Sequence, residues 1–247
     1  VIKKSFLLLT NYICFRIKNQ KPLFMKKILF SGAVLSLILM SCSSSKVATK
    51  ADLGTYINTI TAPELSKHLY IVAGDEMQGR NTGEEGQKKA GKYLIEEYKK
   101  MGVSFPEAAS DWYQKVPSEF MKRGFAPKLN DSENIWAFIK GSEKPDEILV
   151  ISAHYDHVGM KNGEIYNGAD DDGSGTVALL EIAQAFKEAQ KKGHGPKRSI
   201  LFLHVTGEEH GLHGSRYYSE NPLFPLANTV ADINIDMIGR RDTLHPN

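Results

Sequence analysis

Apolar and polar positions along residues 134–239 follow patterns that predict strands and one long helix. Four apolar runs have the length of buried strands, at residues 134–141, 146–159, 198–206 and 230–239. Residues 175–192, GTVALLEIAQAFKEAQKK, have apolar side chains at helical spacing. This order of elements predicts an α/β fold, a three-layer α/β/α sandwich with a mixed, largely parallel central sheet.

Two further helices are predicted ahead of these strands. Thr61 is the expected cap of the first helix. The second covers residues 86–101 and ends at Gly102. The polar residues 74–86 between them are expected to form a turn, and residues 103–132 show no regular pattern.

The N-terminal residues have the features of an export signal. Met25, Lys26 and Lys27 precede a 13-residue apolar run, which is short for a membrane span and typical of a secretory signal. The run ends in LMSC, which resembles the bacterial lipobox that precedes a lipidated cysteine, here Cys42. An ordinary signal peptide with an incidental cysteine is the alternative. We expect an exported lipoprotein anchored in the membrane through Cys42, on the periplasmic or cell-surface side.

These observations divide the chain into four ranges. We expect residues 1–24 to lie upstream of the true start, 25–41 to be the signal peptide, 42–60 a polar tether, and 61–247 the folded domain. Residues 1–41 contain seven Lys or Arg and no acidic residue, which leaves 24 basic and 29 acidic residues in the rest of the chain. This balance gives no electrostatic reason to expect a nucleic-acid partner.

Metal-capable side chains occur at the ends of three predicted strands. His154 and Asp156 end the second strand, Glu208 and Glu209 follow the third, and Asp236 lies in the fourth. A loop with three adjacent aspartates, Asp170–Asp172, follows the second strand. Because working residues gather at the carboxyl ends of strands in such sheets, we expect all of these side chains to converge on one edge.

Each segment alone also has an ordinary structural explanation. Asp156 could orient a metal-binding His154, since both point the same way in an extended strand, but polar strand ends are common. Glu208 and Glu209 suit a metal ligand beside a general base, or the solvated start of a helix. Asp236 lies among apolar residues and needs a metal, an ion pair or hydrogen bonds.

The aspartate run resembles a calcium-binding EF-hand loop in its spacing to Glu181. No helix is predicted to enter this loop, and Glu181 fits the amphipathic helix 175–192. A carboxylate shared by two cations explains three adjacent negative charges better. Neither H-E-x-x-H nor H-x-x-E-H occurs, so we expect His210 and His213 to be exposed or to support other ligands.

Four motifs in order, AHYDHVG, NGADDDGSGTVALLEIA, TGEEHGLHGS and NIDMIG, resemble the bacterial secreted co-catalytic di-zinc aminopeptidases. That family also includes glutamate carboxypeptidase-like enzymes and glutaminyl cyclases. The resemblance covers roughly residues 62–239 and implies a zinc exopeptidase-like fold. It also implies that residues 61–247 form a partial catalytic domain.

The resemblance also implies roles for individual residues. His154 and Asp236 would bind one zinc ion, Asp171 would bridge two, and Glu209 would bind the second. Glu208 would be the general base for a water held between the metals, and Asp156 would orient His154. The family also has a cis peptide bond after the bridging aspartate. Asp170 and Asp172 are then expected to cap or orient the loop.

One residue of the family pattern is not found in the chain. The family's second zinc ion has a further histidine well after the NIDMIG strand, whereas the chain ends eight residues after Gly239 and His245 is too close to serve. We therefore expect a catalytic domain that is incomplete at its C-terminus.

The expected function is a zinc-dependent aminopeptidase that acts on peptide substrates with two zinc ions in the complete protein. Two alternatives remain: a glutaminyl cyclase-like transferase with one zinc ion, and a non-catalytic binding homologue.

Overall fold

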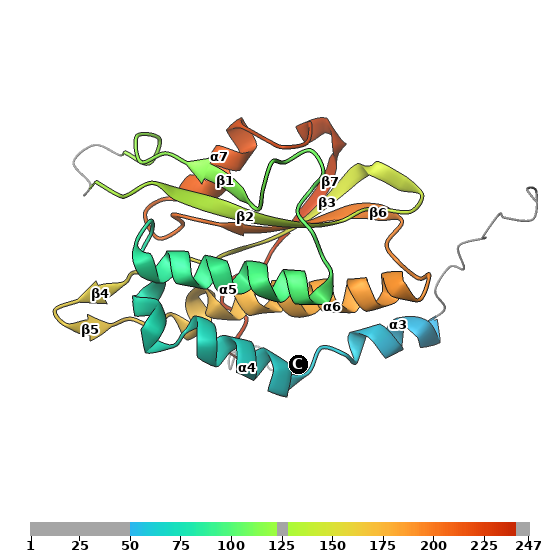
Figure 1. Cartoon of the computed structure of the whole chain (residues 1–247), viewed down its shortest axis with the longest axis horizontal. Helices are drawn as coiled ribbons and strands as arrows, with labels where there is room; N and C mark the ends of the chain where they lie inside the picture. Colours follow the sequence, from blue (N-terminus) through green and yellow to red (C-terminus); the bar gives the residue numbers. More distant parts are fainter. Residues whose placement is uncertain (1–49, 123–127, 241–247) are drawn as a thin grey trace, which may run out of the picture. The chain divides into compact units, whose positions relative to one another are not determined.

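The computed structural model describes residues 50–122 and 128–240, so the expected signal peptide, Cys42 and His245 lie outside the described residues. Five strands form one sheet in the order β1-β2-β6-β3-β7 (Figure 1). Their bounds are Tyr113–Val116 for β1, Ser132–Ile139 for β2, Lys144–His154 for β3, Arg198–Val205 for β6 and Thr229–Asn234 for β7. Strands β6, β3 and β7 pair in parallel, whereas β1, β2 and β6 pair antiparallel. The mixed α/β sheet is confirmed, and its parallel half carries His154.

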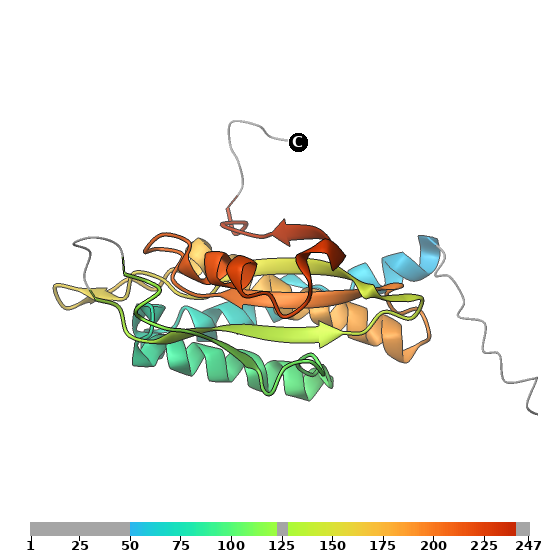
Figure 2. The same cartoon turned by 90° about the horizontal axis from the view of Figure 1, so that it is seen from above.

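Helices lie on both faces of the sheet (Figure 1). Helices α4 (Ala62–Val72), α5 (Glu85–Met101) and α6 (Gly175–Lys191) cover one face. Helix α7 (His213–Glu220) lies on the opposite face. Figure 2 shows β7 at the edge of the sheet, where one of its sides has no neighbouring strand within the described residues.

The remaining elements are short. Helix α3 spans Lys50–Ile57, and the hairpin strands β4 and β5 span Met160–Lys161 and Glu164–Ile165. Short helical segments are η1 (Asp75–Arg80) and η2 (Ala169–Ser174), each with non-helical residues inside it, and η3 (Leu226–Asn228). In the described part of the chain, no helix is both long enough and apolar enough to cross a membrane.

The two faces of the central strands explain why β3 and β6 are almost continuously apolar. Ile151 and Phe202 are buried in the larger core together with Leu94 of α5 and Leu179 of α6. The alternate residues of the same strands, such as Val150, are buried against the opposite face with Tyr218 of α7. Burial on both faces is the usual reason for apolar parallel strands.

Three elements differ from the sequence predictions. Residues 50–57 lie in the range predicted as a tether but form α3, whose Tyr56 hydroxyl is 2.8 Å from His194 Nδ1. Strand β1 lies in the range that showed no pattern, because four residues are too few to show periodicity. Strand β7 ends at Asn234, so Asp236 is in the following loop instead of the strand.

Candidate metal centre and active site

His154 is the last residue of β3, and its two ring nitrogens have different surroundings. Nδ1 lies 3.1 Å from the backbone carbonyl oxygen of Asp156 and 3.7 Å from its carboxylate Oδ1. The sequence predicted that Asp156 orients His154, and in the structure this hydrogen bond goes to the Asp156 backbone. With Nδ1 directed at an acceptor, Nε2 is the nitrogen that is available to a metal.

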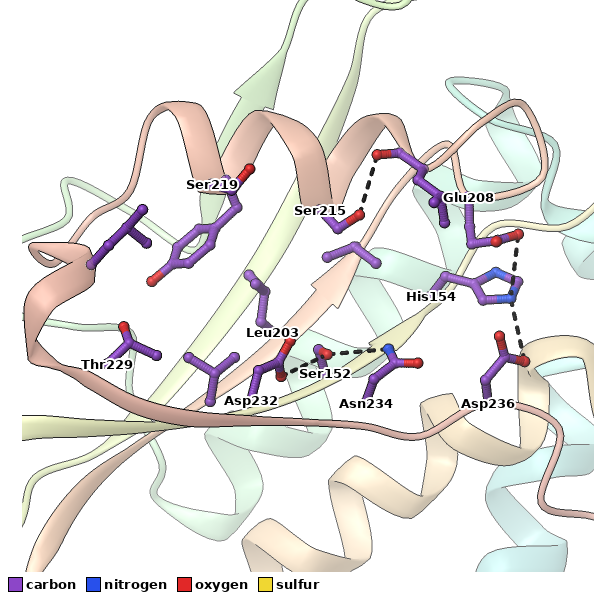
Figure 3. Close-up of a pocket in the computed structure, with 15 residues that line it drawn as sticks. Ser152, His154, Leu203, Glu208, Ser215, Ser219, Thr229, Asp232, Asn234 and Asp236 are labelled. Atoms are coloured by element: carbon purple, nitrogen blue, oxygen red, sulfur yellow. Dashed lines mark hydrogen bonds and ion pairs between the residues drawn. The ribbon is translucent and has the colours of Figure 1, made fainter.

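Three carboxylates from three separate loops surround His154 Nε2. The nearest is Asp171 Oδ1 at 3.1 Å, followed by Glu208 Oε2 and Asp236 Oδ1, each at 3.9 Å. Nε2 is buried and has no hydrogen-bond partner. Figure 3 shows Glu208 and Asp236 directed toward the imidazole from opposite sides. The loops after β3, β6 and β7 thus converge at the carboxyl ends of the parallel strands.

Asp156 is completely buried and connects these loops. Its Oδ2 accepts a hydrogen bond from the Thr82 hydroxyl at 2.7 Å. Its Oδ1 accepts one from the backbone N–H of Glu208 at 3.2 Å. Asp156 therefore holds the backbone of the proposed general base as well as lying beside His154.

The three adjacent aspartates have different partners. Asp172 is buried, and its carboxylate accepts backbone N–H groups of His154 (3.2 Å), Gly175 (2.9 Å) and Met237 (3.3 Å). Asp170 Oδ1 accepts the backbone N–H of Gly239 at 2.8 Å. The side chain of Asp171 is 38% exposed and faces His154. The peptide bond between Asp171 and Asp172 is cis, as the resemblance implied. Of the three aspartates, Asp171 is therefore the one whose carboxylate is available to a metal.

A second group of donors lies next to the first. His157 Nδ1 is 2.5 Å from Glu209 Oε1, and both atoms are buried without a hydrogen-bond partner. Donor atoms of His157, Asp171 and Glu209 all lie within 4.8 Å of one another. Asp171 belongs to this group and also faces His154 Nε2, which is the position expected of a bridging ligand.

Donor atoms of His154, Asp172 and Asp236 also lie within 4.8 Å of one another. We assign Asp171 to that group instead, because the oxygens of Asp172 are already occupied by three backbone N–H groups. Asp171 Oδ1 is also only 3.1 Å from the unpartnered nitrogen of His154.

Burial and mutual repulsion set the electrostatics of the site. Burial raises the pKa of Glu208 and of Glu209, and neighbouring carboxylates raise them further while His154 opposes this. Burial also raises the pKa of Asp172, to about 7. For His154, burial alone would lower the pKa, but Asp156, Asp172 and Glu208 together raise it to about 9. The raised pKa of His154 reflects the negative charge of the carboxylates around it, which a bound cation would offset.

The residues fit zinc. Zinc in proteins takes imidazole nitrogens and carboxylate oxygens, usually four ligands in all. Here the buried Nε2 of His154 makes no hydrogen bond and faces three carboxylates, which is a set of donors of the kind that zinc binds.

Sequence reasoning did not identify three residues of this region, namely Arg80, Thr82 and His157. The only available signal was for His157, which follows the H-x-D pattern directly. Thr82 and Arg80 are more than 70 positions from the strand they support, and no short-range pattern links them.

The remaining sequence candidates lie elsewhere. His210 is exposed and contacts Asn81, and His213 is buried at the start of α7. Neither belongs to a cluster of three metal-capable donors in the described part of the chain. Glu181 lies in α6 and faces His68, which agrees with rejection of the EF-hand interpretation.

Comparisons with known proteins agree with this geometry. The profile of peptidase family M28 matches residues 134–245. Aminopeptidase NAALADL1 of Mus musculus is 38% identical over 112 residues, which are 44% of this chain and 14% of that protein. The chain spans less than a quarter of the length of the first curated relatives that it matches.

Two solved structures share the fold. Glutaminyl cyclase of Porphyromonas gingivalis has a TM-score of 0.60 and 20% identity, over 74% of this chain and 63% of that chain. A Zn-dependent exopeptidase from Parabacteroides distasonis has a TM-score of 0.56 and 22% identity, over 73% and 63%. At these identities the likeness shows the fold alone. Residues 134–245 thus match peptidase family M28, and the fold is that of zinc-dependent exopeptidases.

Proposed function

We propose that the complete protein is a zinc-dependent aminopeptidase that hydrolyses the first peptide bond of peptides. The observation that carries this proposal is the buried, unpartnered Nε2 of His154 within 3.9 Å of three carboxylates from three loops. Imidazole nitrogens and carboxylate oxygens are the donors that zinc takes in proteins. The family match and the name of the mouse relative support a peptide substrate.

Two zinc ions are proposed, with Asp171 shared between them. His154, Asp171 and Asp236 would hold one ion. Asp171 and Glu209 would hold the other, with His157 as the nearest further donor in the described residues. When bound, zinc supplies a Lewis acid that polarises the scissile carbonyl and makes water more acidic.

Glu208 is the proposed general base. Its side chain is 31% exposed, so an attacking water can reach its carboxylate. Burial raises its pKa, which moves it toward the range that suits a proton carrier at neutral pH. Glu208 would take a proton from the attacking water and pass it to the nitrogen of the leaving amine. Asp156 contributes by holding the backbone N–H of Glu208 in place.

The exposure of the proposed metal ligands suits a substrate with a free N-terminus. The side chains of Asp171 and Asp236 are 38% and 42% exposed, so a substrate could reach zinc held there. A free terminal amine could bind such an ion, whereas an acetylated N-terminus could not. This favours an aminopeptidase over an endopeptidase.

A glutaminyl cyclase-like transferase is the second candidate, because that fold is also shared. The second donor group, His157, Asp171 and Glu209, favours the peptidase, since it offers a place for a second zinc ion. A non-catalytic homologue is the third candidate. The presence of Glu208 beside the metal ligands opposes it.

The proposal is tested by incubating the zinc-loaded complete protein with matched peptides that have a free or an acetylated N-terminus. Mass spectrometry should show stepwise loss of N-terminal residues from the free peptide only. A peptide beginning with glutamine distinguishes the transferase, which would release ammonia without cleaving the chain. Absence of both products with bound zinc would leave the binding homologue.

The substitution Glu208→Gln tests the general base in the same assay. We expect zinc content to be unchanged and kcat to fall by roughly 10²–10⁴-fold, the usual contribution of general acid–base catalysis. Glu164→Gln in the β4–β5 hairpin is the matched control and should not change kcat. Normal turnover by Glu208→Gln would contradict the assignment.

We also propose that the protein is anchored in the membrane by a lipid on Cys42. This rests on the basic start at Lys26 and Lys27, the short apolar run and the LMSC sequence. Metabolic labelling with a radioactive or clickable fatty acid should label the exported protein, and Cys42→Ala should remove the label. Labelling that persists in Cys42→Ala would contradict the proposal.

A further inference from the structure

Arg80 places a guanidinium group beneath the metal centre, inside the protein. The residue is fully buried, at 0% exposure. It donates four hydrogen bonds, all to backbone carbonyl oxygens. The acceptors are Val72 (2.8 Å), Tyr155 (3.0 Å), Asn167 (2.7 Å) and Gly168 (2.8 Å). A guanidinium group has five N–H donors in a fixed plane, so four satisfied donors specify its orientation closely.

These acceptors belong to three segments that are far apart in the sequence. Val72 ends α4, Tyr155 follows His154, and residues 167–168 come immediately before the η2 segment that contains Asp171. Arg80 therefore connects the loop of His154 and His157 with the loop of the proposed bridging ligand. A displacement of either loop would break hydrogen bonds to Arg80.

The backbone around Arg80 extends the same connection. The carbonyl of Arg80 accepts the backbone N–H of His157 at 3.1 Å. Two residues later, the hydroxyl of Thr82 donates to Asp156 at 2.7 Å. The segment 80–82 thus contacts every residue from 155 to 157 through hydrogen bonds.

The conformation of this segment is unfavourable by itself. Gln78, Gly79 and Arg80 have φ angles of 51°, 66° and 51°, in the left-handed region that non-glycine residues avoid. In Gln78 and Arg80, which are not glycine, this conformation persists only where the surroundings hold it. A Cβ added to Gly79 would lie 2.5 Å from the carbonyl oxygens of Gly159 and Tyr166. The turn is therefore pressed tightly against the 155–168 region.

The charge of Arg80 is balanced by the site above it. Burial lowers the pKa of Arg80 to about 10, while Asp156, Asp172, Asp171 and Glu209 oppose this decrease. Arg80 remains protonated at neutral pH. No carboxylate forms a direct ion pair with it among the contacts of the described residues, so its fixed partners are carbonyl groups.

We propose that Arg80 is a positioning residue of the metal centre, which holds the loops of His154, His157 and Asp171 in the arrangement that binds zinc. This inference rests on the proposed zinc site. A positive charge near a zinc ion would by itself weaken zinc binding. The proposal therefore requires that the loss of loop positioning outweighs the loss of this repulsion.

The test compares Arg80→Met and Arg80→Lys in the complete protein. Zinc affinity is measured by competition with a chromophoric chelator, on protein shown to be folded by circular dichroism. We expect both variants to bind zinc roughly 10–100-fold more weakly, the usual effect of losing a residue that supports metal ligands. Lysine keeps the charge but offers only three donors without the planar geometry, so it should not restore affinity.

The visible spectrum of the cobalt-substituted protein gives a second readout. Because cobalt absorption depends on ligand geometry, both variants should differ from the wild type in band position or intensity. Arg216→Met is the matched control. Arg216 also donates to a backbone carbonyl, that of Phe120 at 2.9 Å, and belongs to neither donor group. It should leave zinc affinity and the cobalt spectrum unchanged.

The outcomes separate the two proposals. Zinc binding by the wild type with unchanged affinity in both Arg80 variants would overturn the role of Arg80 and leave the zinc site intact. Tighter binding by Arg80→Met, or wild-type affinity in Arg80→Lys, would show that only charge matters and would also overturn it. If Arg80→Met does not fold, Arg80→Lys decides alone. A wild type that binds no zinc overturns both proposals.

Discussion

Helix α6 is associated with two clusters in which a histidine meets carboxylate groups, and they differ in a way that separates function from structure. At the start of the helix, His154 Nε2 has no hydrogen-bond partner and faces Asp171, Glu208 and Asp236. Farther along the helix, His68 lies beside Glu181. Its Nδ1 lies 2.6 Å from the Tyr93 hydroxyl and its Nε2 lies 3.4 Å from Glu181.

The two clusters also differ in accessibility and charge. Glu181 and His68 are buried between α4 and α6, and among the described residues Glu181 is the carboxylate within 4 Å of the imidazole. The carboxylates around His154 are 31–42% exposed and come from three loops. Several accessible carboxylates around one imidazole suit a metal, whereas a single buried carboxylate beside an imidazole between two helices suits helix packing. The comparison thus rests on the number of carboxylates and on their exposure, since the residue types are similar.

The largest expected effect comes from replacing the histidine of each cluster. His154→Gln should weaken zinc binding by more than the roughly 10–100-fold expected for a supporting residue, because it removes a ligand itself. His68→Gln should lower thermal stability and leave zinc affinity unchanged. Isothermal titration of both variants with zinc is the measurement. Equal zinc affinities in the two variants would contradict the distinction between the clusters.

The next largest effect concerns the number of zinc ions. Asp171→Asn weakens a ligand shared by both ions, so bound zinc should fall from about two ions per chain toward none. Asp170→Asn is the control on the adjacent residue, whose carboxylate accepts the Gly239 N–H, and should retain both ions. Elemental analysis after dialysis provides the counts. Loss of zinc in Asp170→Asn but not in Asp171→Asn would contradict the assignment of the bridge.

A smaller effect, on stability, is expected from replacing Asp172. Asp172→Asn replaces an oxygen that accepts backbone N–H groups with an NH₂ group that cannot accept them. A buried N–H group left without an acceptor costs about 1–3 kcal/mol, so the free energy of unfolding of the zinc-free protein should fall by that amount. Urea unfolding monitored by fluorescence measures it. An unchanged unfolding midpoint would show that these hydrogen bonds are not important.

The last prediction concerns the second cluster. Burial, and then Glu64, raise the pKa of Glu181 to about 7 from its ordinary value of 4.5. Because the folded pKa is above the unfolded one, the stabilising contribution is complete below about pH 4.5 and is lost as the pH rises through about 7. Glu181→Gln should therefore be more stable than the wild type at pH 8, by a few kcal/mol at most at ~1.4 kcal/mol per pKa unit.

The same experiment has a control on the same helix. Glu188 is 39% exposed and pairs with Lys191, so Glu188→Gln should leave the pH dependence of stability unchanged. Thermal melts from pH 5 to pH 8 give the comparison. A wild type whose stability relative to Glu181→Gln does not fall over this range would contradict the raised pKa.

The difference between the clusters also explains what the sequence could predict. The apolar runs of β2, β3 and β6 and the periodicity of α6 are local patterns, and they predicted these elements within a few residues. The convergence of His154, Asp171 and Glu208 followed from a general rule about strand ends in α/β sheets. These predictions needed only local sequence and topology.

Other features depend on contacts that no local pattern contains. The pairing of His68 with Glu181 joins residues 113 positions apart on two helices, and each residue looks ordinary in its own helix. Arg80 lies in a polar stretch that the sequence showed only as a turn, yet it contacts residues 167 and 168. Strand β1 has four residues and is defined mainly by its pairing with β2. Contacts between residues far apart in the sequence determine all three features.

The most direct test of the account is the location of zinc in crystals of the zinc-loaded complete protein. Anomalous scattering at the zinc absorption edge locates the ion independently of any assumption about its ligands. We predict a peak about 2.0–2.1 Å from His154 Nε2, the usual zinc–imidazole distance, with Asp171 and Asp236 as further ligands. A zinc-loaded crystal with no anomalous peak beside His154 would contradict the central claim.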